Sequence, residues 1–146
     1  MKLLVLNGPN LNMLGIREKH LYGAQTYEDL KRYILEKAQE LNIDVELYQS
    51  NHEGDLVDKI QSAYGKMDGI IINPAAYTHT SVAVLDALKA VNLPAAEVHL
   101  TDITKREAFR QISYAGMACQ AHFMGLGFEG YAKALEWIKA HIENNG

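Results

Sequence analysis

Cysteine and long apolar runs are scarce in this chain. Its single cysteine, Cys119, excludes an internal disulfide and the cysteine-rich patterns of structural zinc sites. A lone thiol suits a reducing compartment, so we expect a cytoplasmic protein. No apolar run reaches the roughly 18 residues of a membrane span, and the short apolar stretch after Met1 lacks a small-residue cleavage site. The sequence therefore predicts neither a membrane segment nor a signal peptide.

Excess positive charge is also missing. Lys and Arg total 14 against 18 Asp and Glu, which gives a formal charge of −4. A mildly acidic protein binds nucleic acid poorly, because phosphate neutralisation needs a basic surface. An anionic ligand would need a local group of arginines or backbone N–H groups. The 146 residues contain no internal repeat and no linker, and a TIM barrel needs about 250 residues, so we expect a single domain over residues 1–146.

What the sequence does contain is an alternation of apolar runs with segments of helical periodicity. We expect strands at residues 3–7, 44–49, 69–73, 94–100 and 118–124. Helices are expected from Thr26 to Leu41 and at residues 55–64, 81–91, 105–111 and 131–142. The strands are apolar on both faces, which is typical of a parallel sheet covered by helices on both sides. The predicted fold is α/β, with a flavodoxin-like, doubly wound, five-stranded parallel sheet.

Polar side chains follow each of the first four predicted strands. In such folds ligands bind beyond the carboxyl ends of the strands, so these groups are expected to form one site. Two histidines among them could each be an acid, a base or a metal ligand, although no spacing supports a metal. Thr80 and Ser81 could seat a carboxylate or cap the helix that follows. The strand-end candidates are Asn10, Asn12, Asn51, Asn73, His79 and His99.

Two further segments carry candidate groups. Residues 11–24 are long for a strand-to-helix connection and read as a lid, with Arg17 lowering the pKa of Tyr22 so that the phenol can act as a base. The alternative is a surface arginine and a packing tyrosine. Arg106 and Arg110 are four residues apart and would share one face of a short helix. They could bind an anion, or they could form an ordinary solvated face.

Several motifs together resemble one enzyme family. They are LNGPNLN at residues 6–12, LGIRE at 14–18, QSNHEG at 49–54, YTHTSVA at 77–83 and EVH at 97–99, and they occur in order along nearly the whole chain. This pattern is similar to that of the type II 3-dehydroquinate dehydratases. The resemblance implies anti elimination of water from 3-dehydroquinate to give 3-dehydroshikimate, through an enolate and without metal, cofactor or Schiff base. It does not distinguish aromatic amino acid biosynthesis, by the shikimate pathway, from quinate breakdown.

The resemblance also implies roles for individual residues. Tyr22 matches the base, Arg17 the lid residue that keeps it ionised, and His99 the general acid. Glu97 matches the group that supports His99, and Asn10 the residue that orients a water. The implied substrate-binding residues are Asn73, His79, Asp86, Leu100, Thr101 and Arg110, with Asp86 reaching the site of a neighbouring subunit. The family's assembly of trimers into a homododecamer implies partners that are copies of the same chain.

Some positions depart from that pattern. Ala75 stands where the family usually has glycine, and Leu85 where an arginine usually precedes Asp86. Thr101-Asp102 replaces a usual Ser-Asn pair, and residues 118–122, ending in His122, differ from the small apolar residues usual there. Two other interpretations stay open: a flavodoxin-like domain that binds a small ligand, and a catalytically inactive homologue.

Overall fold

Five strands form one parallel sheet in the computed structural model, which describes residues 1–16 and 25–145. The strands are β1 (Lys2–Asn7), β2 (Asp44–Gln49), β3 (Gly69–Asn73), β4 (Ala95–His99) and β5 (Ala121–Met124). Their order in the sheet is β2-β1-β3-β4-β5, and every neighbouring pair is parallel. This is the flavodoxin-like strand order, so the predicted fold is confirmed.

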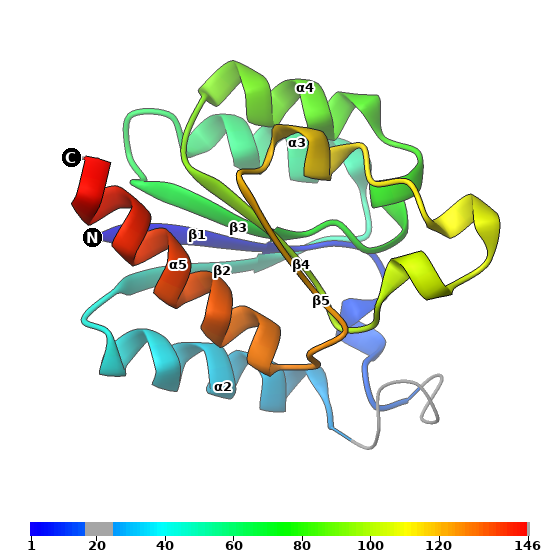
Figure 1. The fold of residues 1–146 in the computed structure, drawn as a ribbon, viewed down its shortest axis with the longest axis horizontal. Helices are drawn as coiled ribbons and strands as arrows, with labels where there is room; N and C mark the ends of the chain where they lie inside the picture. The colour runs from blue at the N-terminus through cyan, green and yellow to red at the C-terminus, as the bar shows by residue number, and fades with distance from the viewer. Residues whose placement is uncertain (17–24, 146) are drawn as a thin grey trace.

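Helices cover both faces of the sheet (Figure 1). On one face lie α2 (Tyr27–Glu40) and α5 (Glu129–Asn145), and on the other lie α3 (Glu53–Ser62) and α4 (Val82–Val91). Alternate residues of β1 point to opposite faces: Leu3 and Val5 pack into the core under α2 and α5, and Leu4 and Leu6 into the core under α3 and α4. Two hydrophobic cores therefore share one sheet, and none of the helices within the described ranges is long and apolar enough to cross a membrane.

Two hydroxyl side chains fix where helices begin. Thr26 caps α2, because its Oγ1 accepts the Asp29 N–H at 3.2 Å while the Asp29 carboxylate accepts the Thr26 N–H at 2.9 Å. Ser81 caps α4 by accepting the Val84 N–H at 2.9 Å, and its side chain is buried. Of the two interpretations of Ser81, the structure supports the helix cap.

The prediction of one helix at residues 105–111 is wrong. Two short 3-10 helices stand there instead, η3 (Ile103–Lys105) and η4 (Ala108–Arg110). Arg106 and Glu107 between them have extended backbone, and a seven-residue segment makes too few hydrogen bonds to offset helix nucleation. The strand expected at 118–124 is also too long, because η5 (Ala115–Ala118) occupies its start and β5 begins at Ala121. Two further 3-10 helices are η1 (Leu11–Met13) and η2 (Ala75–His79).

Candidate active site

A pocket opens at the carboxyl edge of the sheet, as the strand order predicts. Its walls come from the loops after β1, β3 and β4 and from the segment of η3 and η4, at the right of Figure 1. The sequence-predicted residues that line it are Asn10, Asn73, His79, His99, Leu100, Thr101, Arg106 and Arg110. The topology therefore brings together groups that lie up to a hundred residues apart in the chain.

The amides on the β1 and β2 side of the pocket mostly hold loops in place. The Asn51 side chain accepts the Asn10 N–H at 3.0 Å, and Gln49 Nε2 donates to Asn51 Oδ1 at 3.1 Å and to the Gly8 carbonyl at 3.1 Å. A Cβ on Gly8 would lie 2.3 Å from the carbonyl oxygen of Pro74, so this crossing of two loops requires glycine. Asn51 thus serves the turns, whereas Asn10 lines the pocket.

Asn73 is fixed by a neutral hydrogen-bond network that the sequence analysis missed. Its Nδ2 donates to the Tyr131 hydroxyl at 3.0 Å, its Oδ1 accepts the Ala75 N–H at 3.1 Å, and the Tyr131 hydroxyl donates to Asn7 Oδ1 at 2.6 Å. Tyr131 is fully buried, and burial raises the pKa of its phenol far above the usual value, so the ring stays neutral. We refer to Asn7, Asn73 and Tyr131 as the tyrosine network.

Ala75 adopts a left-handed backbone conformation, with a φ of 53°. An L-residue with a side chain avoids this region, because its Cβ approaches the following carbonyl oxygen. This is the position at which the resemblance expects glycine. The departure therefore places mild strain on the loop that carries His79.

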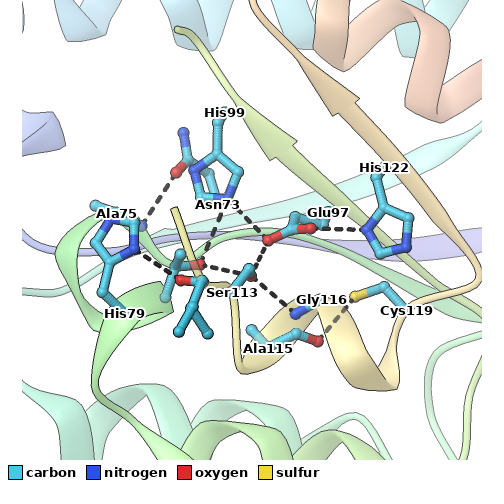
Figure 2. Close-up of polar contacts among 12 residues, drawn as sticks. Asn73, Ala75, His79, Glu97, His99, Ser113, Ala115, Gly116, Cys119 and His122 are labelled. Atoms are coloured by element: carbon cyan, nitrogen blue, oxygen red, sulfur yellow. Dashed lines mark hydrogen bonds and ion pairs between the residues drawn. The ribbon is translucent and has the colours of Figure 1, made fainter. Parts of the chain in front are cut away.

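The site contains a buried carboxylate, that of Glu97, next to His99. Glu97 and His99 are both buried on β4, and His99 Nε2 lies 2.9 Å from Glu97 Oε2 (Figure 2). The Ser113 hydroxyl also donates to Oε2, and His122 Nδ1 lies 2.7 Å from Oε1. Thr78 Oγ1 lies 3.4 Å from His99 Nε2. We refer to Glu97, His99, Ser113 and His122 as the glutamate network.

Glu97 is ionised despite its burial. Burial by itself would raise the pKa of this carboxyl, but hydrogen bonds and charge from His99, with further hydrogen bonds from Ser113 and His122, lower the pKa to about 2. An ionised carboxylate only accepts hydrogen bonds, so His99 Nε2 must carry the donated proton. The ring nitrogen of His99 that stays free for a ligand is therefore Nδ1.

His79 is suited to hydrogen bonding rather than to carrying charge. Its Nδ1 lies 2.8 Å from the carbonyl oxygen of Ile112, so Nδ1 is the donor in that contact. Partial burial lowers the pKa of His79, against the opposing effect of the Ile112 carbonyl, and His99, Arg110 and Arg106 lower it further by their charge. The neutral ring then presents Nε2 as an acceptor, which suits a ligand hydroxyl.

Two arginines line the pocket although they do not share a helix face. Glu107 Oε2 lies 3.1 Å from Arg110 Nε, and Glu107 Oε1 lies 3.7 Å from Arg106 Nε. Arg106 also approaches Thr101 Oγ1 at 3.4 Å through an Nη atom. One exposed carboxylate thus holds the two guanidinium groups near each other. An anionic ligand here would meet positive charge in an otherwise acidic protein.

Not every predicted residue lies in this pocket. Asp86 is exposed on α4 and is not among the residues that line it. Arg17 and Tyr22 lie outside the described residues. Within residues 1–16 and 25–145, no three His, Cys, Asp or Glu side chains are grouped as they would be to hold a metal ion.

Known proteins with similar sequences and structures agree on one family. The model of the class II dehydroquinases matches residues 1–139. A 3-dehydroquinate dehydratase of Caldicellulosiruptor bescii is 55% identical over 97% of this chain and 99% of its own length, and one of Clostridium acetobutylicum is 49% identical over 95% and 96%.

A solved structure extends this agreement to the fold. The crystal structure of a type II dehydroquinase from Butyrivibrio crossotus superposes with a TM-score of 0.93 at 50% identity, covering 95% of this chain and 97% of that one. Sequence, fold and the pocket at the carboxyl edge of the sheet thus point the same way, and the chain belongs to the class II dehydroquinase family.

Proposed function

We propose that this chain is a 3-dehydroquinate dehydratase that eliminates water from 3-dehydroquinate to give 3-dehydroshikimate, with His99 protonating the leaving hydroxyl. Membership of the family and the names of its close relatives support the reaction. One observation carries the role of His99: its ring lines the pocket and rests on a buried, ionised carboxylate. A general acid must face the substrate and be held in place, and the position of His99 in the pocket and its hydrogen bond to Glu97 suit that role.

The base of the elimination is Tyr22 in this proposal, and Arg17 keeps it ionised. Both assignments rest on the motifs at residues 14–18 and 22–23, because the two residues lie outside the described ranges. A phenol with an ordinary pKa of about 10 is a weak base at neutral pH, and a nearby guanidinium lowers that pKa. Asn10 at the rim of the pocket orients a water near the enolate oxygen.

The remaining pocket residues bind the substrate. The substrate carries a carboxylate and several hydroxyls, and the pocket offers the Arg110 guanidinium, the neutral His79 ring and the backbone and hydroxyl at Leu100 and Thr101. Asn73 also binds the substrate, since its Nδ2 donates one hydrogen to Tyr131 and keeps the second for a ligand. Asp86 completes the site of a neighbouring copy in a homododecamer built of trimers. The proposed enzyme is a single cytoplasmic domain that needs no cofactor.

The test is the absorbance of the conjugated enone formed from 3-dehydroquinate, measured for the wild type and for His99→Ala. Loss of a general acid typically costs about 10²–10⁴ in turnover. His141→Ala, on the outer helix α5, is the matched control and should keep wild-type turnover. Each assay is repeated after exhaustive chelation, which should change nothing. Turnover by His99→Ala within threefold of the wild type would show that the acid is another group.

A further inference from the structure

His122 occupies a place that the proposed mechanism does not use. It lies on the edge strand β5, and its side chain is 45% exposed, although its Nδ1 reaches the buried Glu97 carboxylate. Figure 2 shows His99 and His122 on opposite sides of Glu97. The same residue belongs to the segment that departs from the usual small apolar residues of the family.

The two oxygens of Glu97 have different surroundings. Oε2 receives hydrogen bonds from His99 and Ser113, whereas Oε1 receives one from His122 at 2.7 Å. In the part of the chain that the structure describes, the His122 contact is the only hydrogen bond on Oε1. An added Cβ on Gly116 would lie 2.5 Å from this oxygen, so the space beside Oε1 is already closed. Within the described residues, three donors therefore orient the carboxylate, His99 and Ser113 at Oε2 and His122 at Oε1.

We propose that His122 is a positioning residue, which holds the Glu97 carboxylate in the orientation that accepts the His99 Nε2 proton and thereby supports His99 in acid catalysis. This inference rests on the proposed function of His99. Because the ionised carboxylate only accepts, His122 Nδ1 must donate. A hydrogen-bonded partner behind a catalytic ion pair commonly fixes its geometry and its proton affinity.

The other groups around Glu97 do not substitute for His122. Cys119 lies near the carboxylate, but burial and then the Glu97 charge raise the pKa of its thiol to about 12, and its Sγ donates to the Ala115 carbonyl at 3.4 Å. The Ser113 hydroxyl already donates to Oε2, and Thr78 contacts Ser113 and His99. Among the described residues on the pocket side, the charged and titratable groups near His99 are His79, Arg106 and Arg110.

Removing the His122 donor would weaken the support of His99 in a defined direction. Oε1 would be a buried acceptor without its partner, which disfavours the ionised carboxylate and lets it rotate away from His99. A carboxylate that is less charged or turned away stabilises a protonated imidazole beside it less. Turnover would then decline at lower pH on the alkaline side, while substrate binding, which uses other residues, would change little.

The experiment compares three variants with the wild type by measuring kcat and KM across the neutral and alkaline pH range. His122→Phe keeps a ring but removes the donor, and His122→Asn places an amide nitrogen where Nδ1 lies and carries no charge. His141→Phe makes the same ring exchange on α5, where His141 stacks on Trp137. We expect His122→Phe to lose about tenfold in kcat and to shift its alkaline limb about one pH unit lower, with KM within about twofold.

The remaining variants separate a donor effect from a packing effect. His122→Asn should recover most of the kcat and the wild-type pH profile, and His141→Phe should match the wild type. If His122→Phe does not fold, His122→Val replaces it, because a β-branched residue suits an edge strand. An unshifted alkaline limb in the variant without a donor would overturn the proposal. So would His122→Asn showing the same loss and the same profile as His122→Phe.

A second readout does not depend on the assay. The ¹⁵N resonances of the His99 ring report its protonation directly, and we expect them to titrate at lower pH in His122→Phe than in His122→Asn. If His99→Ala keeps its turnover, the proposed function of His99 fails while the ring titration still tests the effect of His122. If His99→Ala is inactive and the ring titration is identical in both His122 variants, the role of His122 alone is refuted.

Discussion

The sheet carries two polar networks near its carboxyl edge, each built around a buried side chain, and they differ in charge. The tyrosine network joins β1, β3 and α5 through neutral amides and a phenol that stays protonated. The glutamate network joins β4, β5 and the segment before η5 through a carboxylate and two imidazoles. Both fix pocket residues, Asn73 in one case and His99 in the other. Neutral hydrogen bonds are enough to hold the Asn73 side chain in place. An acid catalyst such as the proposed His99 needs a buried charge beside it as well.

Breaking the charge of the glutamate network should have the largest effect. Glu97→Gln keeps the size of the side chain but removes the negative charge beside His99. It also places an N–H donor where the partners of Glu97 need a hydrogen-bond acceptor. We expect kcat to fall on the order of a hundredfold, because His99 loses the charge-assisted hydrogen bond that supports it as the acid. Steady-state assays measure this loss. A retained kcat with a folded variant, judged by circular dichroism, would mean that His99 does not depend on Glu97.

Much of the fold that positions the two networks could be predicted from the sequence. The three isoleucines of β3 and the apolar runs of the other strands indicate buried parallel strands, and their order follows from alternation with helices. Because carboxyl ends of parallel strands meet at one edge, His79, His99 and Asn73 were expected together before any contact was known. Glu97 was predicted only through the resemblance of the EVH motif at residues 97–99, and not from its burial in β4.

The partners themselves could not be predicted. In the sequence, the spacing of Tyr131 predicts only an apolar position of the last helix. The packing of α5 against the sheet is what brings its hydroxyl to Asn7 and Asn73. Ser113 lies in a segment without periodicity, and His122 lies on a short edge strand whose start was misplaced. Arg106 and Arg110 both line the pocket, as predicted, but not because they share one face of a helix. The expected helix is two 3-10 turns.

Breaking the neutral network should affect stability more than turnover. Tyr131→Phe removes one hydroxyl, so Asn7 Oδ1 loses its donor and Asn73 Nδ2 loses its acceptor in a buried site. We expect the free energy of unfolding to fall by about 1–3 kcal/mol. Urea titration followed by circular dichroism measures this change. Tyr33→Phe, at a partly buried ring on α2, is the matched control, and an equal loss there would contradict the role given to the network.

The smallest effect is expected in the loop that the tyrosine network orients. Ala75→Gly relieves the left-handed backbone at φ 53° and keeps the N–H that donates to Asn73. Relief of this strain should raise the free energy of unfolding by up to about 1 kcal/mol, offset in part by the greater freedom of glycine in the unfolded chain. Thermal unfolding gives the sign. Ala76→Gly, next to it and also in η2, should only destabilise, and a Tm gain of equal size there would remove the strain argument.

The contrast in charge between the two networks is tested most directly by how stability depends on pH. The pKa of Glu97 in the folded state, about 2, lies below its ordinary value of 4.5. Its contribution is therefore fully present above the ordinary value and is lost as pH falls from there toward the folded value. The loss is on the order of 3 kcal/mol. The neutral tyrosine network has no group that titrates in this range.

The measurement is urea unfolding of the wild type, Glu97→Gln and Tyr131→Phe at neutral pH and at several acidic pH values. We predict that Tyr131→Phe is less stable than the wild type by the same amount at every pH. Glu97→Gln should differ from the wild type most at neutral pH, and the difference should shrink as pH falls below 4.5. A constant difference for Glu97→Gln across that range would contradict the account, because Glu97 would then not be a buried carboxylate that its partners keep ionised.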